Sequence, residues 1–358
     1  MSNTYKTTLL ALLGALLLSG CGGSDRGCFG LCPARDNPDE ETADSTPDPG
    51  DATLDLSCYP TAAISARAQE PYGDESAQQM LRFFDSAAAS DTVNRPVLIW
   101  ITGDTWASEI GVTDAPSKAQ DIAARLGAHY ATVSYRGAGT AAWPAQIQDV
   151  KAAVRFLRAQ NDAAGYRIDP NRYFIGGDQA GAHLAALAAT SNGITEFEPE
   201  ANANQPDNLD LLISLGGAVD LESLLDDNAA LATMCAGQDA PRLDAAAVRQ
   251  LFGCEEPDAG ETALASCDDL NPIIQASPLV YLGSEDPQAL IYHGAMDCQV
   301  PLAQSQQYDD IYTSNTILSG RHLFTEFADD NATLESLTGQ MVVEDLVTFA
   351  ELDCDDET

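Results

Sequence analysis

The chain has 358 residues, of which 55 are acidic and 17 basic, so its formal net charge is −38. Lysine occurs only at Lys6, Lys118 and Lys151. This balance excludes a role that depends on positive charge, such as binding DNA or an anionic lipid surface. We therefore expect no nucleic-acid partner, and we attribute the acidic composition to solubility.

The N-terminus has the features of a secretion signal. Lys6 precedes an apolar run over residues 9–18 that is too short to cross a bilayer. The next residues, "LSGC" at 18–21, resemble a bacterial lipobox, which implies that Cys21 is acylated and becomes the first mature residue. We therefore interpret residues 1–20 as a lipoprotein signal peptide. The acyl chains would anchor the protein to a membrane of the cell envelope, the outer membrane or periplasmic face if the host is Gram-negative.

The segment that follows Cys21 has little to bury. Residues 21–57 are rich in Gly, Pro, Asp and Ser, and this composition predicts a disordered acidic tether. Its carboxylates do not follow the spacing of a calcium-binding EF-hand loop, so we interpret them as solvated charge.

The cysteines predict disulfides rather than a metal site. Apart from Cys21, eight cysteines remain, and an even number in an exported chain is most simply paired in an oxidising compartment. No C-x-x-C motif is present and the four histidines are scattered, so no metal or other cofactor is expected. Eight cysteines allow 105 pairings, which leaves the connectivity open.

The remainder of the chain, residues 58–358, alternates strand and helix signals and predicts one α/β domain. Apolar, β-branched runs of the kind buried in a mostly parallel sheet occur at 95–102, 129–135, 172–176, 211–216, 288–294 and 323–327. Residues 145–160 carry Ile147, Val150, Val154 and Leu157 on one helical face. A closing helix is predicted over residues 334–352.

The order of these segments resembles a known superfamily. Residues 143–187, "WPAQIQDVKAAVRFLRAQNDAAGYRIDPNRYFIGGDQAGAHLAAL", and 276–308, "ASPLVYLGSEDPQALIYHGAMDCQVPLAQSQQY", are similar to the α/β-hydrolases. The closest likeness is to the bifunctional deacetylase/feruloyl-esterase-like branch, beside carboxylesterases and hormone-sensitive-lipase-like proteins. The resemblance implies a mostly parallel eight-stranded sheet flanked by helices, a Ser–Asp–His ester-hydrolase ancestry, and a cap-like insertion at residues 221–275.

The first departure from this family lies at the nucleophile. In α/β-hydrolases the motif G-x-S-x-G forms a sharp strand-to-helix turn that presents the attacking serine. Here Gly177 and Gly181 keep the frame, with Asp178 and Ala180 at the x positions, and Gln179 takes the nucleophile position. A primary amide has no acidic proton for a base to remove, so it is a poor nucleophile.

The oxyanion segment departs as well. Relatives carry a His-Gly-Gly-Gly-Trp type of sequence whose backbone N–H groups bind the oxyanion. At residues 102–106 this chain reads "TGDTW", so Gly103 and Trp106 match while Asp104 introduces a carboxylate. A negative charge at that place opposes the charge that develops in ester hydrolysis.

The third departure is the absence of the triad histidine. Asp297 matches the acid of the triad, but the loop after the last strand, residues 327–334, holds Asn331 and no histidine. One alternative keeps the chain active, with Asp178 as nucleophile and His322 as base. In the other reading the three losses together indicate a pseudoenzyme, whose fold is kept for binding or for envelope organisation.

The ligand class is open at this stage. Trp106, Tyr135 and Trp143 are aromatic candidates for stacking on a sugar or an aromatic ester, and the alternative is that they are core residues. A purely structural surface protein is a further possibility, with a cleft filled by its own side chains.

Overall fold

The computed structural model describes residues 63–79, 81–86, 94–103, 105–107, 117–164, 166–225, 231, 234–236, 242–258, 264, 266–328, 330–331, 334 and 336–350. All of them belong to the compact unit Thr53–Thr358. The signal peptide, the acylation site at Cys21, the tether and Asp104 lie outside the described residues. What the sequence predicts for them therefore stays a prediction.

Eight strands form one sheet in the order β1-β2-β4-β3-β5-β6-β7-β8. Their bounds are β1 Ile64–Glu70, β2 Leu81–Ser86, β3 Arg95–Ile101, β4 His129–Val133, β5 Ile168–Asp178, β6 Leu211–Leu215, β7 Gln288–Gly294 and β8 His322–Phe327. Strands β4, β3, β5, β6, β7 and β8 run parallel to one another. Strand β2 pairs antiparallel with β4, and β1 pairs antiparallel with β2. The expected mostly parallel eight-stranded α/β-hydrolase sheet is confirmed.

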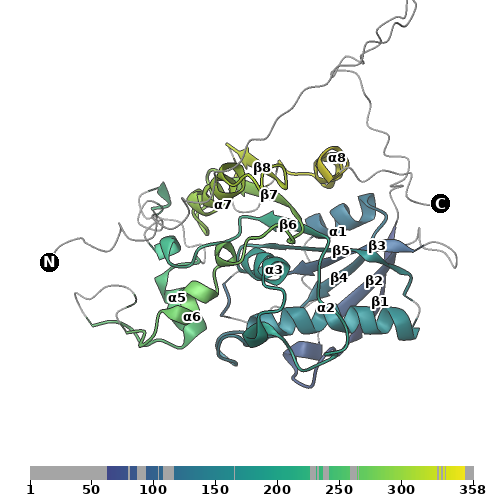
Figure 1. Cartoon of the computed structure of the whole chain (residues 1–358), viewed down its shortest axis with the longest axis horizontal. Coiled ribbons are helices and arrows are strands. Elements are labelled where there is room, and N and C mark those ends of the chain that lie inside the picture. The colour runs from purple at the N-terminus through teal and green to yellow at the C-terminus, as the bar shows by residue number, and fades with distance from the viewer. Residues whose placement is uncertain are drawn as a thin grey trace, which may run out of the picture. The chain divides into compact units, whose positions relative to one another are not determined.

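Helices cover both faces of this sheet (Figure 1). Their bounds are α1 Ser117–Arg125, α2 Ala145–Ala164, α3 Ala180–Thr190, α5 Ala245–Phe252, α6 Asn271–Gln275, α7 Leu302–Ser314 and α8 Gly339–Ala350. Short 3-10 turns lie at η1 Ala77–Gln79, η3 Thr195–Phe197 and η4 Pro278–Val280. Among the described residues, no helix is both long enough and apolar enough to cross a bilayer.

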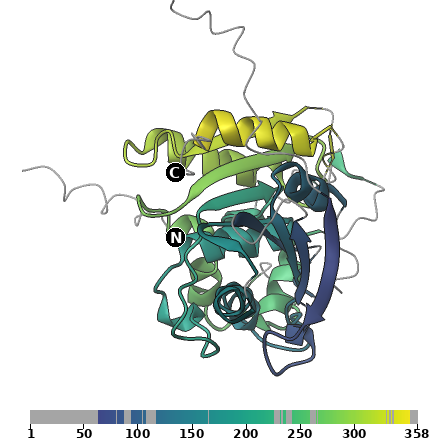
Figure 2. The same ribbon diagram turned by 90° about the vertical axis from the view of Figure 1, so that its right-hand side faces the viewer.

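The alternation of side chains along each strand divides the core into two layers. One layer holds the buried faces of α2, α3 and α7, including the predicted stripe of Ile147, Val150, Val154 and Leu157. The other layer lies under α1 and α8 and contains Trp100. Figure 2 shows α8 on its own side of the sheet, away from α2. Because the strands are parallel, their carboxyl ends meet at one edge, where α/β proteins place their sites.

Candidate functional site: the altered catalytic edge

The turn between β5 and α3 has the geometry of a nucleophile elbow. Gln179 stands alone between the last residue of β5 and the first of α3, with φ 49° and ψ −112°. Its backbone N–H donates to the Leu215 carbonyl at 3.0 Å, and its carbonyl accepts from the His183 N–H at 3.0 Å. A side chain other than glycine is strained at this φ, and such strain concentrates at functional positions.

Glycines make this turn possible. A Cβ added to Gly177 would lie 2.4 Å from the Gly181 carbonyl carbon, and one added to Gly181 would lie 2.1 Å from the Ile101 oxygen. Gly103, in the oxyanion segment, is equally confined, since its Cβ would lie 2.1 Å from the Asp178 oxygen. The glycines that the backbone of the elbow and of the adjoining loop requires are therefore present. The differences from the family motif at this turn concern side chains.

The strain at Gln179 supports a prediction about stability. Gln179→Gly should raise the free energy of unfolding by about 1 kcal/mol, because glycine adopts positive φ at no steric cost. Gln179→Ala keeps the Cβ and serves as the matched control, for which no such gain is expected. Urea unfolding of the two variants measures the difference, and equal stability of the glycine and alanine variants would argue against strain.

Asp297 is buried, with 1% of its surface exposed, in the turn that follows β7. Its Oδ1 accepts hydrogen bonds from the backbone N–H groups of Gln299 at 2.7 Å and Val300 at 3.0 Å. Its Oδ2 has no hydrogen-bond partner. The nearest polar atom recorded is His293 Nε2 at 3.4 Å, and that nitrogen also lies 3.1 Å from the Val300 carbonyl oxygen.

Gln179 and Asp297 meet at the same edge of the sheet, on either side of β6. Gln179 binds Leu215, the last residue of β6, and the next residue is Gly216. Gly216 has φ 57°, and a Cβ placed on it would lie 3.0 Å from Asp297 Oδ2. Gln179, at the position predicted for the nucleophile, and Asp297, predicted to be the triad acid, therefore both lie beside the carboxyl end of β6.

The loop after β8 lies beside the Asp297 turn, and its sequence over residues 327–334 contains no histidine. The Asp330 carbonyl accepts from the Met296 N–H at 2.8 Å. A Cβ added to Gly294 would lie 2.4 Å from the carbonyl oxygens of both Asp330 and Asn331. Asn331 is therefore close to the end of β7, where the histidine of the relatives is expected.

His322 is the wrong choice for a base. It opens β8 and pairs with Ala289 at the start of β7, whereas Gln179 follows the carboxyl end of β5. Its Nε2 lies 2.6 Å from Asp309 Oδ1, and its ring stacks on Tyr312 at a centroid distance of 4.5 Å. Because β5 and β8 run parallel, His322 lies at the amino ends of the strands, whereas Gln179 lies at their carboxyl ends.

Asp178 is also wrong as an alternative nucleophile. Its Oδ1 accepts from Trp100 Nε1 at 3.3 Å, and Trp100 belongs to the core layer under α1 and α8. Gly177, one residue earlier, packs against Gly181 of α3 on the opposite face. Since side chains alternate along a strand, the Asp178 carboxylate points away from the face that carries α3.

The aromatic candidates divide between core and surface. Trp106 and Tyr135 are buried in the core, which leaves no stacking surface on either ring. Trp143 is partly buried and contacts Phe252 at a centroid distance of 5.5 Å. Trp106 instead serves the fold, since its Nε1 donates to His183 Nδ1 at 3.1 Å.

His183 is a fully buried neutral histidine behind the elbow. Because Nδ1 accepts from Trp106, Nε2 carries the proton and donates to the Ala276 carbonyl at 2.8 Å. Burial lowers the pKa of His183 to about 4, against the opposing effect of the Ala276 hydrogen bond. The structure thus holds this side chain neutral at pH values where an exposed histidine is already protonated.

This pKa predicts acid sensitivity. The unfolded chain takes up the proton near pH 6.5 and the folded chain only near pH 4, so stability present above pH 6.5 is lost as the pH falls. The loss from this group should reach about 3 kcal/mol by pH 4. In His183→Gln the group is absent, so the stability gap between wild type and variant should shrink by that amount between pH 7 and pH 4. Urea unfolding at both pH values measures it, and a gap independent of pH would refute the assignment.

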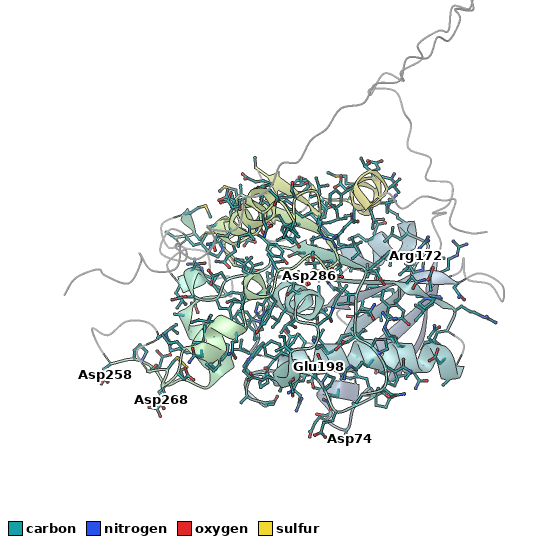
Figure 3. The ribbon with its side chains drawn as sticks, in the orientation of Figure 1. Asp74, Arg172, Glu198, Asp258, Asp268 and Asp286 are labelled. Atoms are coloured by element: carbon teal, nitrogen blue, oxygen red, sulfur yellow. A yellow bond between two sulfur atoms is a disulfide. The ribbon has the colours of Figure 1, made fainter. Side chains whose placement is uncertain are left out.

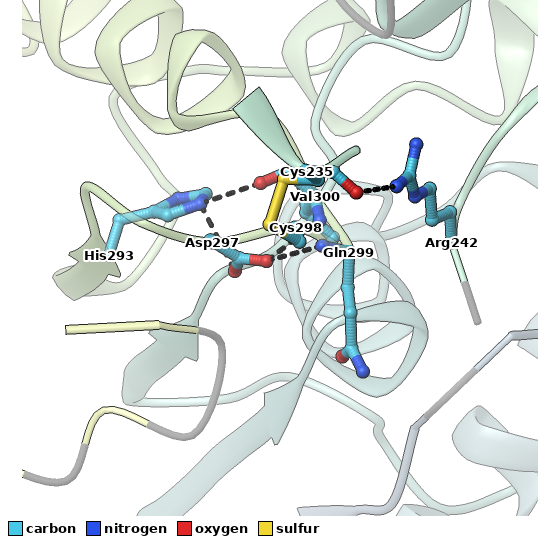
Figure 4. The surroundings of a disulfide bond; sticks show 7 residues. All are labelled: Cys235, Arg242, His293, Asp297, Cys298, Gln299 and Val300. Atoms are coloured by element: carbon cyan, nitrogen blue, oxygen red, sulfur yellow. Dashed lines mark hydrogen bonds and ion pairs between the residues drawn. A yellow bond between two sulfur atoms is a disulfide. The ribbon is translucent and has the colours of Figure 1, made fainter. Parts of the chain in front are cut away.

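Among the described residues, two disulfides involve the segment 221–275, which the sequence predicts to be a cap-like insertion. Cys235 pairs with Cys298, which directly follows Asp297, and Cys254 pairs with Cys267 inside the insertion. Figure 4 shows the first disulfide beside the Asp297 turn, with Arg242 donating to the Cys235 carbonyl at 3.1 Å. The sequence predicted disulfides but no pairing, and the adjacency of Cys298 to Asp297 was the overlooked signal that the insertion is tied to the acid turn.

A cavity of about 750 Å³ lies between the segment 221–275 and the residues Trp143 and Glu196. It is lined by Trp143 and Phe252 and by carboxylates that include Asp258 and Asp268, which Figure 3 shows beyond α5 and α6. Another cavity, of about 590 Å³, lies beside Tyr72 and Arg136. Neither is lined by Gln179 or Asp297. Within the described part of the chain, no group of three or more His, Cys, Asp or Glu residues is arranged to hold a metal ion.

The sheet, the elbow and the acid turn together define an α/β-hydrolase of esterase ancestry. The chain belongs to the BD-FAE family, whose model matches residues 86–311. It is 27% identical to Esterase LipQ and to Esterase LipC of Mycobacterium tuberculosis, over 66% of this chain in each case. The matches cover 50% and 52% of those proteins, so the chain spans about half the length of these curated relatives.

Solved structures show the same fold. A truncated form of a carbohydrate esterase from gut microbiota superimposes with a TM-score of 0.63 at 24% identity, covering 81% of this chain and 96% of that one. An acetyl ester-xyloside bifunctional hydrolase from Caldicellulosiruptor lactoaceticus gives a TM-score of 0.57 at 15% identity, covering 82% and 98%. At these identities the likeness is one of fold.

Proposed function

We propose that this chain is an esterase-fold protein that has lost ester hydrolysis and that its altered catalytic edge binds a small ligand. The observation that carries the proposal is Gln179, an amide held at φ 49° in the strained position of the attacking nucleophile. No acyl-enzyme forms on an amide at neutral pH. The absence of the triad histidine, and the pairing of Asp178 with Trp100 on the opposite face of the sheet from α3, argue against the remaining routes to a triad-like reaction.

The retained features favour binding over a purely structural role. Gln179 is 9% exposed, and its amide offers both N–H donors and a carbonyl acceptor to a ligand at this position. The printed names of the structural relatives, a carbohydrate esterase and an acetyl ester-xyloside hydrolase, support a sugar as one candidate ligand, and an aromatic ester is another.

Ester turnover tests the loss of catalysis. The purified full chain, with Asp297→Ala and Asp178→Ala beside it, would be assayed with short p-nitrophenyl esters across pH. We expect rates at the buffer background for all three proteins. Turnover by the wild type that disappears in either variant would overturn the proposal.

We further propose that the protein is exported and anchored through acylated Cys21, with residues 21–57 as a tether. The support is the apolar run followed by "LSGC". Expression in a bacterial host with radiolabelled palmitate should label the wild type and leave Cys21→Ser unlabelled and released from membranes. Equal labelling of both proteins would contradict the anchor.

A further inference from the structure

The geometry points to a modification site on the surface beside the Asp297 turn: we propose that the thioethers of Met234 and Met296 are oxidised reversibly to sulfoxides by hydrogen peroxide while the protein stays folded. This inference is independent of the proposed function, because it needs neither a nucleophile nor a bound ligand. Of the five methionines in the chain, the structure describes Met234, Met296 and Met341.

The first support is the exposure of these two side chains. Met234 is 42% exposed and Met296 is 49% exposed, and both are among the large apolar side chains that reach the surface of the described chain. Met341 differs from them, because it is partly buried and packs against the core layer under α1 and α8. An oxidant in solution therefore reaches the first two side chains more readily than the third.

The second support is that both methionines flank one disulfide whose own sulfur atoms are shielded. Met234 precedes Cys235, and Met296 lies shortly before Cys298. The two cysteines are bonded to each other, with their Cα atoms 5.7 Å apart, and they pack with Leu231 into a small cluster. Because Cys235 is fully buried and Cys298 is 5% exposed, the thioethers rather than the disulfide are accessible to an oxidant here.

The third support is the way in which the acid turn holds Met296. Its backbone N–H donates to the Asp330 carbonyl at 2.8 Å, and the next residue, Asp297, is buried. The turn therefore keeps Met296 at the surface as part of its own structure. A sulfoxide disrupts a packed core, but an oxygen added to an exposed side chain displaces no packed neighbour. Met296 can thus change from apolar to polar without loss of the fold.

The reaction is a two-electron oxidation of sulfur. The thioether sulfur donates a lone pair to one oxygen of hydrogen peroxide, and the O–O bond breaks. The departing hydroxide takes the proton from the oxygen that is now bound to sulfur and leaves as water. The sulfur is oxidised to the sulfoxide while the peroxide is reduced, and methionine sulfoxide reductases, one for each epimer, reverse the change.

Peptide mapping of the full chain by mass spectrometry after mild treatment with hydrogen peroxide tests the site. We expect Met234 and Met296 each to gain one oxygen about tenfold faster than Met341, and the two reductases to remove both oxygens. The chain oxidised at these two residues should keep the urea-unfolding midpoint of the untreated chain. In denaturing urea the three rates should agree to within about twofold, because the structure that shields Met341 is lost.

Two variants keep the result decisive. Met296→Leu should take up one oxygen fewer and leave the oxidation of Met234 unchanged, and Met341→Leu is the matched control that should leave both sites unchanged. Equal oxidation of the three methionines in the folded chain, a preference that persists in urea, or a lowered unfolding midpoint after oxidation would overturn the proposal. Because the measurement is a mass and not a turnover, its outcome is separate from whether the wild type hydrolyses esters.

Discussion

Introducing serine at Gln179 together with histidine at Asn331 is expected to produce ester hydrolysis that neither change produces alone. The elbow already has the backbone of a nucleophile turn, with Gln179 at φ 49° and glycines on both sides. Asp297 can orient an introduced imidazole, because its Oδ2 accepts no hydrogen bond, although His293 Nε2 lies 3.4 Å away. Gln179→Ser alone lacks a base and Asn331→His alone lacks a nucleophile, so the two changes depend on each other.

A well-placed general base contributes about 10²–10⁴-fold, so the double variant should exceed either single variant by about 10²-fold with p-nitrophenyl acetate. The rate should stay below that of an intact triad, because the sequence predicts that Asp104 in the oxyanion segment opposes the developing charge. Adding Asp297→Ala to the double variant should abolish the gain. A double variant no faster than Gln179→Ser would show that residue 331 does not reach the histidine position.

Removing the disulfide between Cys235 and Cys298 is expected to have the largest effect on stability. This disulfide spans 63 residues, whereas the disulfide between Cys254 and Cys267 spans 13. Because loop-closure entropy grows with loop length, replacing both cysteines by serine should cost about 4 kcal/mol for the long loop and about 3 kcal/mol for the short one. Urea unfolding of the two serine pairs measures this order.

The long-range disulfide also holds the turn that carries Asp297, and the short one serves as its matched control. In the background of Gln179→Ser with Asn331→His, loss of Cys235 and Cys298 should therefore lower the ester-hydrolysis rate, while loss of Cys254 and Cys267 should leave that rate unchanged. A larger destabilisation from the short loop than from the long one would contradict this account of how the insertion is attached.

Much of the fold could be predicted from the sequence because buried parallel strands are continuous apolar runs. Residues 129–133 and 288–294 are strands whose limits differ from the predicted ones by at most two residues. The elbow was visible for a similar reason, since "GGDQAG" contains glycines that a tight strand-to-helix turn requires. Both signals are local in the chain.

The features that could not be predicted depend on contacts between distant segments. Side chains along β5 point alternately to the two faces of the sheet, so a shift of one residue decides whether Asp178 faces α3 or Trp100. The position of His322 follows from its register with Ala289, which no local pattern encodes. The antiparallel strands β1 and β2 lack a continuous apolar run, since they read "ISARAQE" and "LRFFDS", so their pairing at one side of the sheet has no strong local signal.

The central claim is that the strained elbow presents no nucleophile, and intact-protein mass spectrometry after treatment with a fluorophosphonate tests it most directly. This reagent forms a phosphorus–oxygen bond to an activated serine and releases fluoride. We predict that the wild type keeps its mass and that the variant with Gln179→Ser and Asn331→His gains one adduct on residue 179. A stoichiometric adduct on the wild type that is lost in Asp297→Ala would contradict the account.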